Sequence, residues 1–328
     1  MKILILGAKG NLGQQLVKVF SSSTLTSASS VEPLRAANDF QVIGWDIEEI
    51  DITNQEQVKN KIIELKPDII VNAAAYNAVD KCETDEKQYE LAKKLNGEAV
   101  GYIADAAIKI KAVLVHYSTD YVFSNTNQTN LERIKRIMKR GGFREDDQPA
   151  PVNKYAETKL MGEQELIKRG EQGLKWYLIR TSKLFGVKGA SQMTKQSFFD
   201  IMLEIANQRE SGKNSRESNK NLANKGIDVV DEEVSCFTYT PDLAKATSGL
   251  VKSGKPYGIY HLVNQGPCTW YQAAKELFKL AKINVKVNPV SSDKFPRPAK
   301  RPKYSVLINT KLKPMRNWQE ALREYLNK

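Results

Sequence analysis

A tyrosine and a lysine, Tyr155 and Lys159, lie four residues apart just after a helix-start signal, the segment 149–153 with two prolines and Asn153 as a plausible cap. On a helix, residues at this spacing project from one face, so the two side chains would enter the same volume. A free tyrosine titrates near ~10, and a neighbouring ammonium lowers that pKa by favouring the tyrosinate. The pair could therefore serve acid–base chemistry. The alternative is a solvent-exposed pair, which contributes little.

A second feature is the glycine-rich turn near the start of the chain. The apolar run Ile3–Leu6 is followed by Gly7, Gly10 and Gly13 and then by an amphipathic stretch that ends at Phe20. Strand, glycine turn and helix in this order are the context of a dinucleotide-binding fingerprint. The glycines permit a tight turn and a close approach to a pyrophosphate, and the helix N-terminus favours an anion. A cofactor site together with a proton donor indicates a reductase.

Two further apolar runs end in residues suited to a ligand site. The segment 113–117 is typical of a buried parallel strand, and Ser118 and Thr119 follow at its carboxyl end, where doubly wound sheets bind ligands. A hydroxyl there can donate a hydrogen bond to a carbonyl oxygen that is being protonated. The run 68–71 leads into the small residues of 72–75, Asn-Ala-Ala-Ala, against which a flat cofactor can lie. Alternatively, these alanines begin a helix after a core strand.

These motifs occur in a familiar order, and the chain resembles the dTDP-4-dehydrorhamnose reductase family of extended short-chain dehydrogenases/reductases. The shared motifs are Gly7-x-x-Gly10-x-x-Gly13, Asn72-Ala-Ala-Ala75, Ser118-Thr-Asp-Tyr-Val-Phe123, Tyr155-x-x-x-Lys159, Arg180-Thr-Ser182, Thr240-Pro-Asp-Leu-Ala244, Gly258-Ile-Tyr-His-Leu262, Thr269-Trp-Tyr271 and Ala299-Lys-Arg301-Pro302. The resemblance covers most of the chain and excludes three insertions. It implies an NAD(P)H-dependent reductase of a 4-keto nucleotide sugar, with dTDP-4-dehydro-L-rhamnose as the expected substrate and dTDP-L-rhamnose as the product.

The resemblance also implies a role for individual residues. The catalytic group would be Thr119, which contacts the substrate carbonyl, Tyr155, the proton donor, and Lys159, which holds the nicotinamide ribose. The expected cofactor contacts are Gly7, Gly10, Asn11, Leu12, Gly13, Asp46, Asp51, Ile52, Ala74, Ala75, Tyr76, Asn77, Tyr117, Tyr155 and Lys159. The expected substrate contacts are Thr119, Asp120, Lys183 and Arg301.

The residue at the end of the second predicted strand bears on cofactor choice. A carboxylate at Asp46 accepts hydrogen bonds from the 2′-hydroxyl of NADH but repels the 2′-phosphate of NADPH. Lys9, in the glycine turn, could offset that phosphate charge, and the resembling family often accepts both cofactors. NADH is therefore the expected cofactor, with NADPH as the alternative.

Several positions depart from the family pattern. Lys183 stands where relatives usually carry an aromatic residue, and the segment 231–238, Asp-Glu-Glu-Val-Ser-Cys-Phe-Thr, replaces the family's Asp-Asp-Gln-x-Gly-x-Pro-Thr. In the family both places normally shape the substrate pocket, so these departures bear on which base and sugar are bound. Relatives that hold a metal use acidic residues near the first helix, where this chain has Gln14 and Gln15, so no metal is expected.

The order of the predicted elements indicates an α/β fold, a Rossmann-type doubly wound parallel sheet with a smaller α/β substrate-binding domain. Residues 1–182 and 239–264 would form the dinucleotide-binding domain, and residues 183–238 and 265–328 the substrate-binding domain. The insertions lie near 21–38, 125–143 and 207–226. The first is serine-rich and the last has few apolar side chains, so both read as linkers.

The middle insertion is basic and amphipathic. Residues 131–140 carry five cations and one acid, and Leu131, Ile134 and Met138 fall on one side at helical spacing. A helix here, between Thr119 and Tyr155, could close over the substrate as a lid. The alternative is a solvated surface helix.

The composition agrees with a cytoplasmic enzyme. The chain has 328 residues, of which 41% are hydrophobic, and no apolar run approaches the length of a signal peptide core or a membrane span. Three scattered cysteines, Cys82, Cys236 and Cys268, are expected to be buried reduced thiols. The net charge of +12 would help to capture a polyanionic nucleotide sugar and cofactor, or it follows from the basic insertions. No membrane or nucleic-acid partner is expected, and a homodimer is possible.

Two other functions are compatible with these motifs. Some proteins of this superfamily bind NAD(P) as non-catalytic regulatory subunits; an intact Thr119, Tyr155 and Lys159 argues against that function, while the altered segment 231–238 mildly favours it. The other is a nucleotide-sugar epimerase or dehydratase, which would oxidise and re-reduce its substrate and retain NAD tightly.

Overall fold

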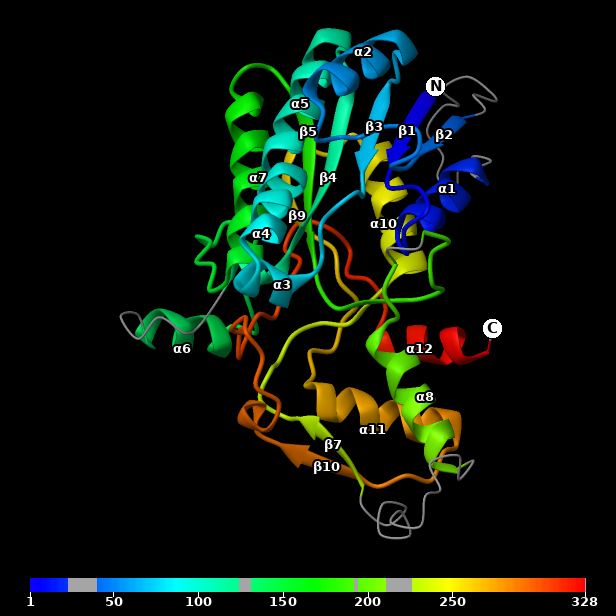
Figure 1. Cartoon of the computed structure of the whole chain (residues 1–328), viewed down its shortest axis with the longest axis vertical. Helices are drawn as coiled ribbons and strands as arrows, with labels where there is room; N and C mark the ends of the chain where they lie inside the picture. Colours follow the sequence, from blue (N-terminus) through cyan, green and yellow to red (C-terminus); the bar gives the residue numbers. More distant parts are fainter. Residues whose placement is uncertain (23–39, 124–130, 192–193, 211–225, 328) are drawn as a thin grey trace.

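The computed structural model describes residues 1–22, 40–123, 131–191, 194–210 and 226–327. Six parallel strands form the central sheet in the order β2-β1-β3-β4-β5-β9 (Figure 1). They are β1 (Lys2–Leu6), β2 (Gln41–Trp45), β3 (Ile69–Asn72), β4 (Val113–Thr119), β5 (Lys175–Thr181) and β9 (Gly258–His261). Two small parallel pairs lie outside this sheet: β6 (Leu184–Phe185) with β8 (Thr238–Tyr239), and β7 (Ile227–Val230) with β10 (Val287–Val290). The predicted Rossmann-type α/β class is confirmed.

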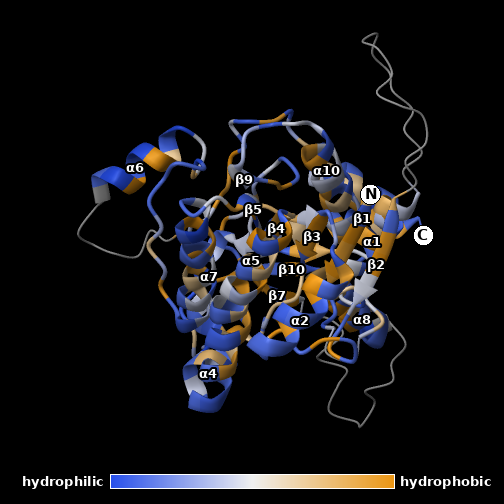
Figure 2. Ribbon diagram, turned by 90° about the horizontal axis from the view of Figure 1, so that it is seen from above, coloured by the Kyte–Doolittle hydropathy of each residue, from blue (hydrophilic) through white to orange (hydrophobic). Residues whose placement is uncertain are grey.

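Helices cover both faces of the sheet because its strands are apolar on both sides (Figure 2). Leu4 and Leu6 point to one core, which α2 (Gln55–Leu65), α5 (Ala99–Ile110) and α7 (Lys154–Gly170) close. Ile3 and Ile5 point to the other, under α1 (Gly13–Ser21) and α10 (Thr240–Lys252). Two short helices, α3 (Val79–Thr84) and α4 (Glu86–Lys93), lead into α5 through a π-helical turn at Lys94–Glu98.

A second apolar core lies below the carboxyl ends of the strands in Figure 1. It is built from α8 (Phe198–Glu210), α11 (Trp270–Ala281), α12 (Trp318–Leu326) and β7. Between these elements the chain rejoins the large sheet, where β9 pairs with β5. The return of segment 240–262 to the sheet follows the predicted order, while the numbered domain boundaries stay a prediction.

Local signals in the sequence account for several helix ends. Asn153 caps α7, its side chain accepting a hydrogen bond from the backbone N–H of Ala156, as predicted. Thr269 and Gln272 form a reciprocal capping box at the start of α11. These caps matter for function because α7 carries Tyr155 and Lys159.

The basic insertion forms a helix, α6 (Leu131–Lys139), but its apolar side differs in part from the prediction. Ile137 is buried against Phe143, Val306 and Leu307, and the predicted Ile134 packs on the same cluster, whereas Met138 is 49% exposed. In Figures 1 and 2, α6 lies at the edge of the molecule beyond α7, opposite α1. The structure thus favours the solvated surface helix over the lid. The linker segments predicted within 21–38 and 207–226 fall almost wholly outside the described residues.

Two predictions from composition can be compared with the structure. Cys82, Cys236 and Cys268 are free and buried, so the expectation of buried thiols is confirmed. Among the described helices, none combines the length and the apolar character needed to cross a membrane.

Candidate active site

The glycine turn lies where the strand order reverses. β2 and β3 flank β1 on opposite sides, so a crevice forms beyond the carboxyl ends of β1 and β3. Gly7 has a φ of +73°, and a Cβ on it would lie 2.7 Å from the backbone nitrogen of Ala74. A Cβ on Gly13 would overlap the carbonyl oxygen of Gly7. Both positions require glycine, and the bare turn that results fits a dinucleotide pyrophosphate.

Asp46 lies beside this turn at the end of β2. Its carboxylate accepts hydrogen bonds from the backbone N–H groups of Lys9 (2.9 Å) and Ile47 (3.0 Å). The Lys9 ammonium pairs with Glu48 at 3.0 Å, and this hydrogen bond raises the pKa of Lys9. The cation that could offset a 2′-phosphate is therefore engaged by a carboxylate. Among the described residues, the carboxylates Asp46, Glu48 and Glu49 all act on Lys9, so negative charge predominates around Asp46.

The other residues predicted to contact the adenosine half of the cofactor have side chains that are engaged within the protein. Asp51 uses its carboxylate locally, accepting from the backbone N–H (2.9 Å) and hydroxyl (2.7 Å) of Thr53. The side chains of Ile52 and Leu12 are buried in the two cores of the sheet, so only their backbones could face a ligand. Asn11 directs its side chain to the segment that follows β6.

The segment after β3 resolves one alternative. Residues 73–78 have no helical structure, and α3 begins only at Val79, so the alanines do not start a helix. The Asn72 side chain accepts from the Ala74 backbone N–H (3.2 Å) and contacts the His116 ring on β4 at 3.2 Å. The segment containing Ala74 and Ala75 thus runs as an extended edge beside the glycine turn.

The three predicted catalytic side chains do not meet at one point. The Tyr155 hydroxyl lies 3.5 Å from Oδ1 of Asn77, and Thr119 is close enough for its hydroxyl to lower the pKa of Tyr155 by hydrogen bonding. The Lys159 ammonium instead donates to the carbonyl oxygen of Tyr117 at 2.7 Å. Tyr117 itself is tied to α10, because its hydroxyl lies 2.7 Å from the Thr247 hydroxyl.

Burial governs how these groups titrate. It raises the pKa of Tyr155 above its ordinary value, and the nearby Asp120 carboxylate adds to that rise. It lowers the pKa of Lys159 to about 8, against a smaller opposite effect of Glu163. The expectation that the ammonium lowers the tyrosine pKa is therefore wrong for this structure. The lysine contacts a carbonyl instead, and Tyr155 is a neutral phenol, the form that can donate a proton.

One residue that the sequence analysis missed supports the site. Asn96, fully buried in the π-helical turn, accepts from the Tyr76 backbone N–H (2.9 Å) and donates to the Tyr76 carbonyl (3.0 Å). It also donates to the hydroxyl of Thr158 on α7, at 3.0 Å. Asn96 thus joins the edge that carries Asn77 to the helix that carries Tyr155. The sequence does carry a signal for this residue: an asparagine next to Gly97 within a helical stretch is unfavourable unless its side chain makes specific hydrogen bonds.

The substrate side of the site begins at Asp120. Its carboxylate accepts from Ser305 (2.6 Å) and from Thr119 (3.2 Å), and burial raises its pKa to about 6. Lys183 acts on Asp120 through its charge, and burial lowers the pKa of Lys183 to about 8. Lys183 has a φ of +39°, a backbone conformation that is uncommon for a residue with a side chain.

The ammonium of Lys183 lies over aromatic rings. It is 3.8 Å from the ring centre of Trp270 and 5.1 Å from that of Phe237. It also donates to the backbone carbonyl of Glu233 at 3.3 Å. The Glu233 carboxylate is buried between Arg297 and the Trp270 indole N–H (2.9 Å). The positions that depart from the family pattern are therefore neighbours, and they form one cation–aromatic cluster.

Arg301, predicted to bind substrate, is held by an ion pair. It donates to Asp80 of α3 at 2.7 Å and to its neighbour Ala299. The Ala299 backbone N–H also donates to Asp80, at 3.2 Å. The C-terminal segment is thereby fastened to the first turn of α3, shortly after Asn77 in the chain.

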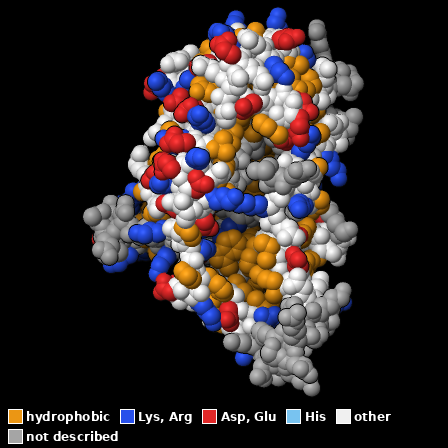
Figure 3. Space-filling view, viewed as in Figure 1, with side chains coloured by type: hydrophobic (Ala, Val, Ile, Leu, Met, Phe, Trp, Pro, Cys, Tyr) orange, Lys and Arg blue, Asp and Glu red, His pale blue; other side chains and the backbone are white. Residues whose placement is uncertain are grey.

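The surface agrees with this placement. Figure 3 shows a hollow lined with hydrophobic side chains in the lower half of the molecule, with Lys and Arg side chains above it.

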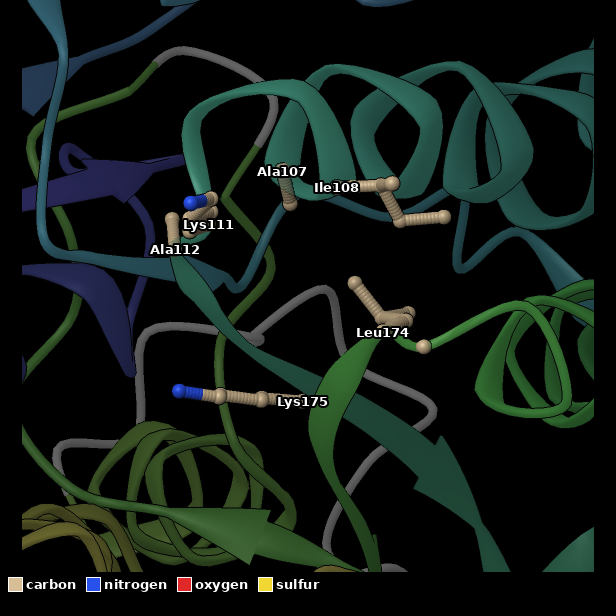
Figure 4. A pocket seen from close by; sticks show the side chains of 7 residues that line it. Ala107, Ile108, Lys111, Ala112, Leu174 and Lys175 are labelled. Carbon is tan, nitrogen blue, oxygen red and sulfur yellow. The ribbon is translucent and has the colours of Figure 1, made fainter.

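A separate pocket of about 100 Å³ lies between Ala107, Ile108 and Leu174 (Figure 4). It adjoins the residues before β4 and at the start of β5, which is the amino end of the sheet. Ligands of doubly wound sheets bind at the opposite end.

Comparisons with known proteins agree with this geometry. The family model described as "RmlD substrate binding domain" matches residues 1–328. A dTDP-4-dehydrorhamnose reductase structure from Clostridium acetobutylicum is 33% identical, with a TM-score of 0.78 and coverage of 100% of this chain and 99% of that one. The Bacillus anthracis enzyme of the same name, solved with NADP, is 30% identical, with a TM-score of 0.77 and coverage of 99% and 98%.

A third relative carries a different name. A probable dTDP-4,6-dihydroxy-2-methyloxan-3-one 4-ketoreductase from Streptomyces antibioticus is 33% identical over 99% of this chain and 94% of its own length. Full-length matches of this kind, together with the sheet order and the glycine turn, identify the family. The chain belongs to the RmlD substrate binding domain family, among proteins named dTDP-4-dehydrorhamnose reductase.

Proposed function

We propose that this protein is an NAD(P)H-dependent reductase of a 4-keto nucleotide sugar, and that it converts dTDP-4-dehydro-L-rhamnose to dTDP-L-rhamnose. The observation that carries the proposal is the convergence of Tyr155, Thr119 and Asn77 beyond the carboxyl ends of β3 and β4. The names of the relatives support the substrate class, and the intact catalytic trio supports turnover over a purely regulatory function.

Each residue has a distinct task in this proposal. A bound nicotinamide supplies the hydride. Thr119 donates a hydrogen bond to the carbonyl oxygen of the sugar and so stabilises the negative charge that develops there. Tyr155, kept as a neutral phenol by burial, then gives its proton to that oxygen. Lys159, now on the Tyr117 carbonyl, can use its remaining N–H groups to bind a ribose hydroxyl and to stabilise the phenolate that is left.

The cofactor is proposed to be NADH in preference to NADPH. The argument rests on Asp46, whose carboxylate is fixed by two backbone N–H groups, and on Glu48, which engages Lys9. Since a B. anthracis relative was solved with NADP, NADPH remains an accepted cofactor in this proposal.

The cluster around Lys183 favours a variant substrate as the second candidate. Lys183 and Glu233, which is buried and paired with the partly exposed Arg297, occupy positions that shape the pocket in relatives. A cation over Trp270 leaves less ring surface for a sugar or base to stack on. The S. antibioticus relative illustrates that the family name covers more than one 4-keto sugar.

The test is oxidation of NADH and NADPH in the presence of a panel of 4-keto nucleotide sugars that varies the base and the sugar. We expect the fastest reaction with dTDP-4-dehydro-L-rhamnose and NADH. A faster reaction with another sugar would change the proposed substrate and leave the proposed type of reaction unchanged. Cofactor binding without oxidation for any sugar would indicate a regulatory subunit, and NAD retained through purification would indicate an epimerase or dehydratase.

A further inference from the structure

The segment Val187–Ser191, here called the strap, lies on the glycine turn although more than 170 positions separate them in the chain. Gln14 donates its side-chain N–H to the Val187 carbonyl at 2.8 Å. The Gly189 backbone N–H donates to the Asn11 side chain at 2.7 Å. The Ser191 backbone N–H donates to the carbonyl of Lys9 at 3.1 Å. Three residues of the turn and first helix thus each bind the strap.

Gly189 makes this close approach possible. A Cβ on Gly189 would overlap the carbonyl oxygen of Lys9 and would lie 2.8 Å from the backbone nitrogen of Asn11. The φ angle of Gly189 is not positive, so its backbone conformation does not require glycine. Glycine is required here because there is no room for a side chain. Any larger residue would push the strap away from the turn.

Lys195 extends the same contact toward the reacting end of the crevice. Its backbone carbonyl accepts from the Asn11 side chain at 3.2 Å, and its ammonium donates to the carbonyl of Asn77 at 3.3 Å. Lys195 therefore spans the interval between the turn, where a pyrophosphate fits, and Asn77 beside Tyr155. The Asn77 carbonyl takes one of the three ammonium N–H groups and cannot neutralise the charge.

The charges around Lys195 indicate an anionic ligand. Partial burial and the positive charges of Lys81 and Arg301 lower its pKa, while Asp80 opposes them. Asp80 is already paired with Arg301. Lys195 thus has its backbone beside the glycine turn and a side-chain ammonium that neighbouring cations repel. Such an ammonium is suited to a phosphate, since a negative ligand would relieve the repulsion.

We propose that the strap forms the outer wall of the pyrophosphate site and that Lys195 binds the pyrophosphate of the dinucleotide. This inference rests on the proposed function only in placing a dinucleotide at the glycine turn. The diphosphate of the sugar nucleotide is the other ligand of the same chemistry, and the experiment below separates the two.

The experiment compares Lys195→Met with Lys109→Met, which removes the same charge from an exposed residue of α5 outside the site. Isothermal titration with ADP-ribose reports the cofactor pyrophosphate, and titration with dTDP reports the substrate diphosphate. Lys195→Met should raise the Kd for ADP-ribose about fivefold to tenfold and reduce its dependence on salt, because a screened charge contact is lost. Lys109→Met should match the wild type, and the Kd for dTDP should not change in either variant.

Gly189→Ala supplies a second, independent perturbation. By lifting the strap it should weaken ADP-ribose binding to a similar extent, and adding Lys195→Met should weaken it little further because both changes act on one contact. Unchanged ADP-ribose binding in Lys195→Met, or a loss confined to dTDP, would overturn the inference and leave the proposed function intact. A wild-type protein that binds no ADP-ribose would overturn both.

Discussion

The ammonium of Lys159 lies 2.7 Å from the carbonyl oxygen of Tyr117, on the strand next to its own helix, and not on Tyr155. The contact fixes the lysine beneath the site while leaving Tyr155 with Asn77 and Thr119. Burial keeps Tyr155 a neutral phenol, so the residue carries the proton that a proton donor must give.

The first prediction concerns that proton. Tyr155→Phe should lower kcat by about 10²–10⁴-fold, the usual contribution of a general acid, while the Kd for NADH stays within about twofold. Steady-state kinetics and fluorescence titration of NADH give the two values. Tyr102→Phe, on the surface of α5, is the control and should behave as the wild type. Full activity of the Tyr155 variant would remove this residue from the chemistry.

The second prediction concerns cofactor choice. Asp46→Ala should move the ratio of kcat/KM values toward NADPH by about tenfold, equivalent to about 1.4 kcal/mol, because repulsion of the 2′-phosphate is relieved. Glu48→Gln should move it in the same direction, since Lys9 would be released. Glu56→Gln, at an exposed position of α2, controls for the loss of a charge. A ratio that does not move in Asp46→Ala would show that this carboxylate does not face the ribose.

The third prediction concerns the cation–aromatic cluster. Lys183→Met keeps the length of the side chain and removes the charge over Trp270. If Lys183 helps to select the sugar nucleotide, KM should rise by about tenfold, equivalent to about 1.4 kcal/mol, with little change in the Kd for NADH. Kinetics on the preferred sugar and on one lacking a ring hydroxyl would locate the contact. Equal KM values in the variant and the wild type would leave Lys183 a packing residue.

The fourth prediction concerns pH and stability. Burial lowers the pKa of His261 to about 3, while an unfolded histidine titrates near ~6.5. The unfolded state therefore binds the extra proton, so stability from this group is present above the unfolded pKa and is lost as the pH falls from about 6.5 toward 3. His116 has its pKa lowered by burial as well and acts in the same direction. Urea unfolding of wild type and His261→Gln between pH 4 and 7 should show a shallower slope in the variant. Parallel curves would contradict the assignment.

The sequence predicted the parallel sheet, the glycine turn and the Tyr155–Lys159 helix because each depends on local order: apolar runs, glycines at fixed spacing and an Asn153 cap. It placed Ile134 of α6 on the packed side, but it also placed Met138 there, which is exposed, and missed Ile137, which packs on Phe143 and the distant Val306. Helical spacing identifies a face but not the surface that covers it.

Contacts between distant segments were the other part that sequence reasoning missed. Asn96 joins Tyr76 to Thr158, and the strap joins Gly189 to Asn11, each across many positions. The actual partner of Lys159 is a backbone carbonyl, which has no signature in the residue type. Such contacts follow from the packed fold and carry no local pattern.

The most direct test of the central claim is transfer of deuteride from NADH labelled at C4 on the transferable face. Mass spectrometry of the product formed from dTDP-4-dehydro-L-rhamnose should show one deuterium on the sugar for each NADH oxidised, and its rate should fall in Tyr155→Phe in step with kcat. A product without deuterium, or NADH that stays reduced while the sugar is consumed, would contradict the account.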